Sequence, residues 1–100
     1  MEISVTQADG ITIVNVPGNL DVITSTMFKQ ALDEVIANST NIELDFAKTV
    51  LVTSAGLRVL LQAEKNVNKA EKNMVFINVS SDVMEIFEIT GVSKIFKINK

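Results

Sequence analysis

The order of apolar patterns along the chain is the feature that most constrains its fold. Runs typical of β-strands alternate with segments whose apolar residues recur at helical spacing. The predicted strands are 2–7, 11–16, 41–46, 74–79 and 95–98, and the predicted helices are 24–38, 54 to about 69 or 72, and a short one around 83–87. After the first two strands, helices and strands alternate, which favours parallel neighbours joined by right-handed crossovers. The sequence therefore predicts an α/β domain of order ββαβαβαβ with a mixed, mostly parallel sheet.

Several predicted strands have one polar side. The runs that begin at Ile3, Ile42 and Ile95 each alternate apolar and polar residues. A parallel sheet covered by helices on both faces is instead apolar on both sides. We therefore expect the helices mainly on one face of the sheet, and the other face to contact water or a second copy of the chain.

Local signals predict where the first elements turn, begin and end. Asp9-Gly10 lies between two strand-like runs and indicates a β-hairpin. Thr24 is a plausible N-cap for the first helix, with Ile23 and Phe28 placed to form a hydrophobic staple. Gly91 stands where a glycine commonly ends a helix.

The composition removes several classes of chemistry. The 100 residues suit a single domain, residues 1–100, and they include neither cysteine nor histidine. Disulfides and thiolate metal sites are thereby excluded. The Ser–His and Cys–His nucleophile systems are excluded too, along with the commonest metal ligand. We expect no cofactor and no metal, and we expect a binding protein rather than an enzyme.

Charge and hydropathy bear on partners and location. The net charge of −3 argues against nucleic acid as the main partner, because phosphate neutralisation needs a basic face. No apolar run approaches the roughly 20 residues of a membrane helix. The start of the chain lacks the basic-then-apolar layout of a signal peptide. We therefore expect a cytoplasmic protein without membrane contact.

The segment from Val52 to Leu61 opens the most convincing helix. Thr53 and Ser54 are both good N-cap residues. Gly56 falls in the first turn, where we expect the missing side chain to leave the backbone accessible. Ser54 is thus predicted at a helix N-terminus, where free N–H groups and the helix dipole favour a negative charge. Its hydroxyl could carry a phosphate there, or it could serve as an ordinary N-cap.

The remainder of this helix divides into two faces. The predicted buried stripe is Gly56, Leu60, Ala63, Val67 and Ala70, widened by Leu57 and Leu61, and the predicted outer face carries Arg58, Glu64, Lys65, Lys69 and Lys72. The lysines could suggest nucleic-acid binding. Interleaved acidic residues and the lack of a nearby aromatic residue favour a solvated helix end instead.

Two acidic residues precede predicted helices. Asp21 ends a turn-rich segment, and Asp45 lies at the end of a predicted strand. Asp45 could be a site residue near Ser54 or a carboxylate that stabilises a turn. If the two acids converged they could bind magnesium and support a small enzyme, although no motif favours that possibility.

The segment Val52-Thr53-Ser54-Ala55-Gly56-Leu57 resembles the STAS domain of bacterial anti-sigma-factor antagonists. That family carries hydrophobic-Asp-Ser-Ser/Thr/Ala-Gly-Leu before an apolar helix, and the first serine of that motif is its phosphorylation site. The matching residue here is Ser54, and Thr53 stands where the family pattern has Asp. Gly18, Leu20 and Asp21 match a Gly-x-Leu-Asp segment of the family, and residues 88–96 resemble its C-terminal part.

The resemblance implies a phosphorylation-switched binding module. The unphosphorylated form would bind an anti-sigma factor that is also a serine kinase, and so release a sigma factor. The kinase would phosphorylate Ser54, the complex would dissociate, and a serine phosphatase would reset the switch. The residues expected to contact the partner are Asp21, Thr53, Ser54, Ala55, Gly56 and Arg58. The alternative is a STAS scaffold or sensor that binds a protein or a nucleotide without phosphorylation.

Overall fold

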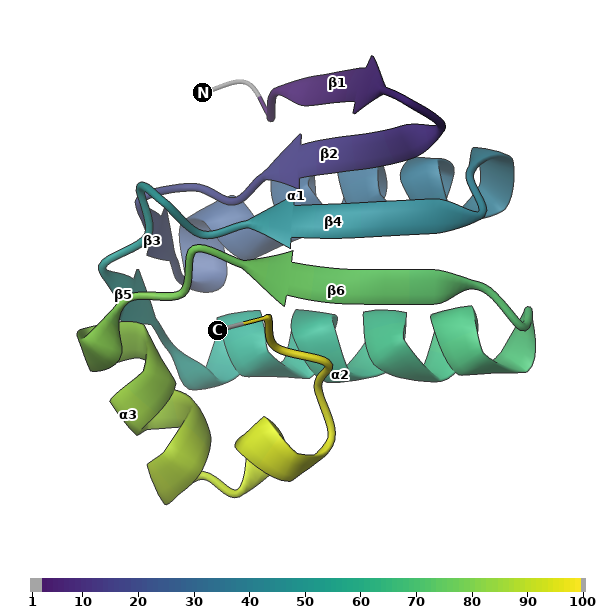
Figure 1. The fold of residues 1–100 in the computed structure, drawn as a ribbon. Coiled ribbons are helices and arrows are strands. Elements are labelled where there is room, and N and C mark those ends of the chain that lie inside the picture. Colours follow the sequence, from purple (N-terminus) through teal and green to yellow (C-terminus); the bar gives the residue numbers. More distant parts are fainter. Residues whose placement is uncertain (1–2, 100) are drawn as a thin grey trace.

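The computed structural model describes residues 3–99, which form one α/β unit (Figure 1). The elements in chain order are β1 (Val5–Ala8), β2 (Ile11–Asn15), β3 (Asn19–Leu20), α1 (Val22–Asn38), β4 (Asn41–Asp45), β5 (Leu51–Val52), α2 (Ser54–Lys69), β6 (Asn73–Ile77), α3 (Ser81–Ile89) and a 3-10 turn, η1 (Val92–Lys94). Within these residues, none of the helices is both long enough and apolar enough to cross a membrane.

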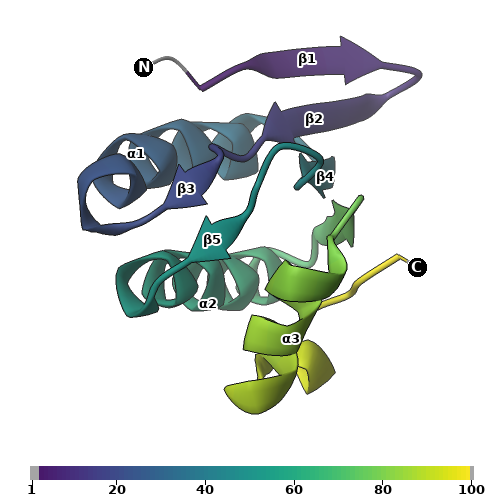
Figure 2. The ribbon, with the colours of Figure 1, turned by 90° about the vertical axis from the view of Figure 1, so that its left-hand side faces the viewer.

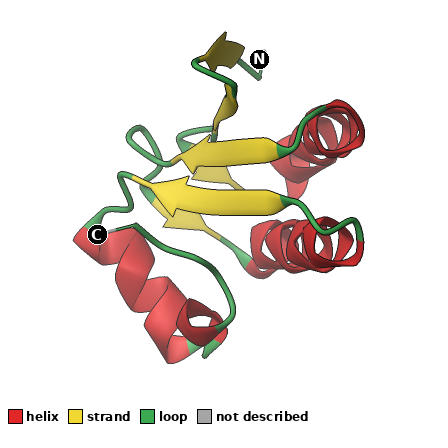
Figure 3. Cartoon of the chain, turned by 45° about the vertical axis from the view of Figure 1, so that its right-hand side comes forward, coloured by secondary structure: helices red, strands yellow, loops and turns green. Residues whose placement is uncertain are grey.

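The main sheet has four strands in the order β1-β2-β4-β6. β1 is antiparallel to β2, whereas β2, β4 and β6 are parallel to one another. The two long helices, α1 and α2, lie side by side against one face of this sheet (Figure 3). The predicted α/β class, with a mostly parallel sheet and helices mainly on one face, is confirmed.

Along each of the parallel strands β2, β4 and β6, buried residues alternate with half-buried or exposed ones. This agrees with the expectation that one face of the sheet is covered and the other is not. Val14, Leu44 and Phe76 point toward the helices and are fully buried. Their neighbours Glu43 and Val75 are only half-buried on the opposite face. The side chains of the helix-covered face therefore form the core, and no helix among residues 3–99 covers the opposite face.

The hairpin between β1 and β2 is confirmed. Asp9 and Gly10 have φ values of 54° and 80°, respectively. Two consecutive positive φ angles define a type I′ turn, whose twist matches that of the flanking strands. This turn sets the register in which Val5 faces Val14 and Ala8 faces Ile11.

The predicted strand at 95–98 is wrong in its extent. The chain forms η1 and then touches the sheet at one bridge, between Phe76 and Ile98. Phe96 stacks on Phe76 with ring centroids 4.5 Å apart, inside a cluster that also includes Phe46 and Phe87. Burying Phe96 in this aromatic cluster holds the segment in a compact turn, which leaves little extended chain for strand pairing.

The first helix begins at a different residue from the predicted one. Asp21 is its N-cap, and Thr24 occupies the third helical position, where its hydroxyl accepts a hydrogen bond from the Asp21 N–H at 3.0 Å. The predicted staple is also wrong, because Ile23 is 82% exposed while Phe28 is fully buried. A carboxylate that reaches two first-turn N–H groups is the better cap, and it moves the start of the helix upstream.

The predicted faces of α2 hold within the helix except at two positions, and Lys72, predicted on the outer face, lies beyond the helix and donates to the carbonyl of Ile36. Gly56, Leu60, Ala63 and Val67 are buried as expected, whereas Ala70 is the exposed C-cap. Glu64 was expected on the outer face and is instead only 4% exposed. Helical periodicity places Glu64 beside the buried stripe, and the tertiary neighbours of α2 complete its burial.

Candidate functional site

Two short parallel strands bring the starts of both long helices to the same end of the molecule. In the two-stranded sheet, Asn19 of β3 faces Leu51 of β5, and Leu20 faces Val52. β3 leads through Asp21 into α1, and β5 leads through Thr53 into α2. Figure 2 shows the two strands side by side, each running into the helix that follows it. The sequence missed this pairing because a two-residue strand carries no periodicity.

Hydrogen bonds hold the segments before these helices together. Thr49 is almost fully buried, and its hydroxyl donates to the carbonyl of Pro17 at 2.8 Å. The backbone N–H of Val50 donates to the carbonyl of Gly18 at 2.8 Å, and that of Thr53 donates to the carbonyl of Leu20 at 3.0 Å. The position of Ser54, one residue further on, is therefore set by the neighbouring segment.

Ser54 is the first residue of α2, and its side chain is exposed. The N-cap position belongs to Thr53, so Ser54 is not the N-cap. Thr53 does not cap with its side chain either, because its hydroxyl is 3.4 Å from the carbonyl oxygen of Leu20, to which it donates. The exposed Ser54 hydroxyl is thus accessible to another protein.

The start of α2 differs from the starts of the other two α-helices in the described part of the chain. The Asp21 carboxylate accepts from the N–H groups of Ile23 and Thr24, at 2.9 and 3.0 Å. The Ser80 hydroxyl accepts from the N–H of Val83 at 3.2 Å. The side chain of Thr53, the N-cap residue of α2, accepts no such hydrogen bond. The first N–H groups of α2 therefore lack a side-chain acceptor and favour an anion in front of them.

Gly56 is buried, which corrects the prediction of an accessible backbone. A Cβ atom at this position would lie 2.6 Å from the carbonyl oxygen of Leu20 and 2.8 Å from its Cγ. The missing side chain lets α2 pack directly against β3. Gly56 can therefore act on a partner only by positioning the start of α2.

Four exposed apolar residues lie on the first turn of α1 and on the segment that leads into α2, and we call them the apolar rim. It comprises Val22, Ile23, Val50 and Leu51, which are 73%, 82%, 67% and 43% exposed. These residues belong to the segments that the β3–β5 pairing holds together. Clustered exposed apolar side chains of this kind mark interaction surfaces. The sequence signal for Ile23 was misleading, because its apolar character was assigned to a staple.

The remaining predicted contact residues lie on the first two turns of α2. Ala55 is half-buried, and Arg58 is exposed. Arg58 follows Ser54 by four residues, so the two side chains lie on the same side of the helix, one turn apart. A cation at this position can approach a negative group placed on Ser54.

Asp21 and Asp45 are both engaged in local structure. The N–H groups of Thr24 and Ile23 hold the pKa of Asp21 below its ordinary value. Asp45 Oδ1 accepts from the N–H of Ala47 at 2.9 Å and from the side-chain amide of Asn78 at 3.0 Å. Asp45 is thus the turn-stabilising carboxylate of the two alternatives. Among residues 3–99 no three potential metal ligands of the His, Cys, Asp and Glu types come together.

The sequence as a whole matches a known family. Residues 2–100 match the STAS domain. The chain belongs to the STAS domain family. An anti-sigma-B factor antagonist of Listeria monocytogenes is 29% identical to this STAS domain over 99 residues, which cover 98% of this chain and 86% of the relative. The anti-sigma-F factor antagonist RsfB of Mycobacterium tuberculosis is 28% identical, over 96% of this chain and 80% of the relative.

Solved structures show the same fold. An anti-sigma factor antagonist from Mycobacterium paratuberculosis superposes on this STAS domain with a TM-score of 0.86 at 24% identity, covering 96% of this chain and 82% of that one. The Bacillus protein SpoIIAA in its phosphorylated form gives a TM-score of 0.73 at 14% identity, covering 98% and 91%. At these identities the likeness establishes the STAS fold alone.

Proposed function

We propose that this STAS domain is an anti-sigma-factor antagonist that is switched by phosphorylation of Ser54. In the unphosphorylated form it binds an anti-sigma factor with serine kinase activity and so releases a sigma factor. The observation that carries the proposal is an exposed serine at a helix start without a side-chain cap, beside the apolar rim. The names of the relatives, which are anti-sigma factor antagonists, support the same assignment.

The apolar rim supplies affinity for the partner. Val22, Ile23 and Val50 are more than half exposed, so covering them removes apolar surface from water. Each square ångström of apolar surface covered contributes about 25 cal/mol. The backbone contacts between the segments before α1 and α2 present this surface in one arrangement, which limits the ordering cost of association.

Phosphorylation of Ser54 lowers the affinity for the partner by placing negative charge inside this surface. A phosphoserine carries a charge of about −1.5 to −2 at neutral pH. Burying that charge unpaired against an apolar partner would cost several kcal/mol, and about 3 kcal/mol already lowers affinity about a hundredfold. In the free domain, the uncapped N–H groups of α2 and the Arg58 guanidinium stabilise the phosphate, so the fold survives modification.

The kinase and phosphatase activities belong to partner proteins in this proposal. Asp21 and Asp45, the carboxylates nearest in sequence to the starts of α1 and α2, are committed to a helix cap and to a turn. Ser54 therefore acts as a substrate that needs no activating base on its own chain. The domain is a binding protein, and other proteins add and remove the phosphate on Ser54.

Phosphorylation of the intact domain by the kinase retrieved from the source cells tests the proposal. Incubation with this kinase and ATP should add one phosphate, which tandem mass spectrometry should map to Ser54. The matched control is Thr53→Val, which removes the neighbouring hydroxyl and should still be modified. Label confined to other residues would contradict the proposal.

A binding measurement separates the switch from the scaffold alternative. Isothermal titration calorimetry should show that Ser54→Asp weakens binding to the retrieved partner at least tenfold, whereas Ser54→Ala binds like wild type. Equal affinities for the three proteins, with the fold intact by circular dichroism, would favour a scaffold or sensor that works without phosphorylation.

A further inference from the structure

β1 is an open edge of the main sheet. The sheet order places β1 at one end, with β2 as its neighbour (Figures 1 and 2). The N–H of Asn15 donates to the carbonyl of Ser4 at 2.9 Å, which fixes which residues of β1 bond to β2. Because backbone groups in an antiparallel pair alternate in direction, those of Thr6 face β2 and those of Val5 and Gln7 face outward.

Within the described part of the chain, this edge lacks the usual protection against pairing. All four residues of β1 are exposed, and the strand carries no charge and no proline. Its register with β2 runs without interruption from Val5 to Ala8, so no bulge bends the edge away. Protein edge strands are normally blocked by charge, proline, bulges or a covering element, and an unblocked edge is a template for another strand.

We propose that β1 pairs antiparallel with β1 of a second copy of this chain, on a two-fold axis that passes beside Thr6. In this register Val5 of one copy faces Gln7 of the other, and their outward N–H and C=O groups bond to each other. Thr6 faces Thr6 across the axis as a non-hydrogen-bonded pair. The two main sheets then continue into each other, which removes the open edge of both copies.

The side-chain surroundings of β1 favour a second copy as the occupant. An open groove of about 330 Å³ lies between β1 and α1, and its mixed lining includes apolar Ile3, Val5, Ala31 and Val35 and one acidic residue, Glu34. Val5 is 41% exposed at this groove. In the proposed register, Val5 of one copy lies beside Gln7 of the other on the same face of the joined sheet, so the neighbouring strand covers the exposed side of Val5.

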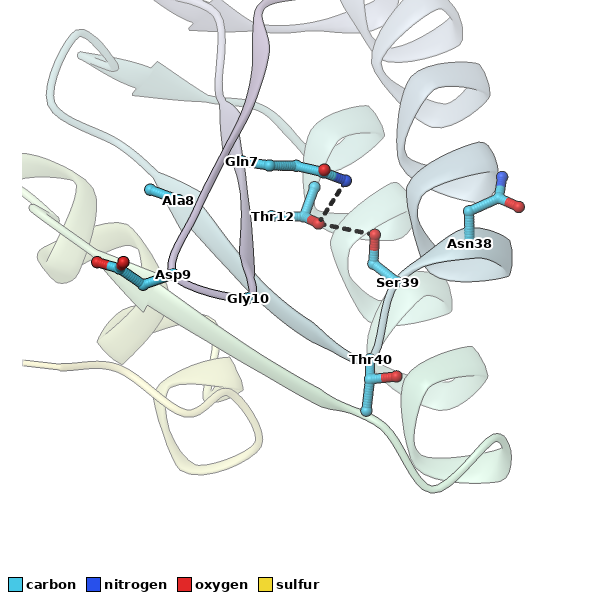
Figure 4. A pocket seen from close by; sticks show the side chains of 8 residues that line it. All are labelled: Gln7, Ala8, Asp9, Gly10, Thr12, Asn38, Ser39 and Thr40. Carbon is cyan, nitrogen blue, oxygen red and sulfur yellow. Dashed lines mark hydrogen bonds between the residues drawn. The ribbon is translucent and has the colours of Figure 1, made fainter.

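Gln7 is held in a position compatible with this pairing. Its amide donates to the Thr12 hydroxyl at 3.4 Å, and that hydroxyl is 2.8 Å from the hydroxyl of Ser39 at the end of α1 (Figure 4). The side chain is thus drawn back toward its own chain, while the backbone groups stay on the open edge. Residues 3–8 carry no charge, so two copies meet without like-charge repulsion between the paired strands despite the net charge of −3.

The proposed dimer leaves the Ser54 site free. β1 and β6 lie at opposite ends of the four-stranded order, and α2 lies below β6 in Figure 1 while β1 lies at the top. A dimer through β1 therefore presents two start regions of α2, each open to a partner. The inference is independent of the proposed function, because it concerns a different part of the molecule.

Disulfide trapping tests the register directly, because the chain contains no cysteine. Cα atoms in a non-hydrogen-bonded antiparallel pair lie about 4.5 Å apart, within the range that a disulfide spans. Thr6→Cys should therefore form a covalent dimer on mild oxidation, seen on a non-reducing gel. Ala8→Cys is the matched control: it lies on the same strand and face, but it faces Ser4 of the second copy and should remain monomeric. Equal cross-linking of both variants would contradict the proposed register.

Sedimentation equilibrium tests the association itself with the unmodified chain. Wild type should approach twice the 10.9 kDa mass of the monomer as its concentration rises. Gln7→Pro removes an outward N–H without removing a bond to β2, and it should stay monomeric, whereas Gln7→Ala should still dimerise. A wild-type protein that remains monomeric at millimolar concentration, or a Gln7→Pro variant that dimerises like Gln7→Ala, would overturn the proposal.

Discussion

Gly56 in α2 and Leu20 in β3 are in direct contact, and the Leu20 carbonyl lies where any side chain at position 56 would have to go. A Cβ at Gly56 would be 2.6 Å from that oxygen, a separation that real structures do not sustain. The Leu20 carbonyl also accepts the hydrogen bond of the Thr53 N–H at the start of α2. Leu20 therefore contacts α2 at Gly56 and also fixes, through Thr53, the position of the adjacent Ser54.

Gly56→Ala should destabilise the domain although alanine is the better helix former. The helix-propensity gain is about 1 kcal/mol and overpacking costs about 1–3 kcal/mol. The upper part of that range applies here, because the atom in the way is the backbone carbonyl oxygen of Leu20 and not the end of a flexible side chain. We expect a net loss of about 1 kcal/mol or more in the free energy of unfolding, measured by urea titration. Gly18→Ala is the control, because its Cβ would lie 3.4 Å from the nearest atom, the Lys48 carbonyl oxygen. Equal stability of Gly56→Ala and wild type would show that the contact relaxes without cost.

Asp21→Ala should lower the urea midpoint by removing the cap of α1. The pKa of Asp21 is held below its ordinary value by the N–H groups it accepts from, so the ionised form is the stabilising one. This contribution is present at neutral pH and is lost as the pH falls through the lowered pKa in the folded state. The difference between wild type and Asp21→Ala should therefore shrink in acid. A difference that stays constant down to pH 2 would rule out the charged cap.

Glu64→Gln should stabilise the domain at neutral pH and remove part of its pH dependence. Burial raises the pKa of Glu64, against the opposing effects of Lys97 and Asn68, and Glu64 Oε1 has no hydrogen-bond partner within the described residues. A raised pKa in the folded state means that wild type gains stability as the pH falls from neutral through that pKa. The variant should lack this gain. Exposed Glu85→Gln is the control, and a parallel pH profile for Glu64→Gln and wild type would contradict the prediction.

Ile23→Ser and Val50→Ser should weaken partner binding without weakening the fold. Both side chains are more than two-thirds exposed, so their loss removes little from the core. If the apolar rim contacts the anti-sigma factor, calorimetry should show at least a fivefold loss of affinity for each variant. Ile89→Ser is the matched control, because Ile89 is 77% exposed but lies at the end of α3. Equal losses for all three variants would indicate that the rim has no special role.

The sequence predicted the main architecture because its decisive signals are local. Alternation along β4 gave one buried face, and helical spacing gave the stripe from Gly56 to Val67. The Asp9-Gly10 pair predicted a hairpin turn, because both residues readily adopt the positive φ angles that this turn needs. The position of Ser54 at a helix start also followed from neighbouring residues, and the structure places it there.

Most of the failures occurred where residues distant in the chain decide the outcome, and the cap of α1 is a local exception. There the Asp21 carboxylate, three positions upstream, accepts from the N–H of Thr24 and is the cap in its place. Glu64 was predicted on the surface but is buried, because the spacing of apolar residues does not show which elements pack beside a helix. The aromatic cluster around Phe96 replaced a predicted strand with a compact turn.

The sequence by itself determined the order of the main-sheet strands and the three α-helices, the apolar faces and the placement of Ser54 at a helix start, because each depends on the spacing of neighbouring residues. Only the tertiary structure decided that β3 and β5 pair, that the Thr53 hydroxyl turns to Leu20, and that Val22 and Val50 stay exposed. The physical reason is that these features arise from contacts across about 30 positions of the chain, where burial and hydrogen bonding outweigh local preference.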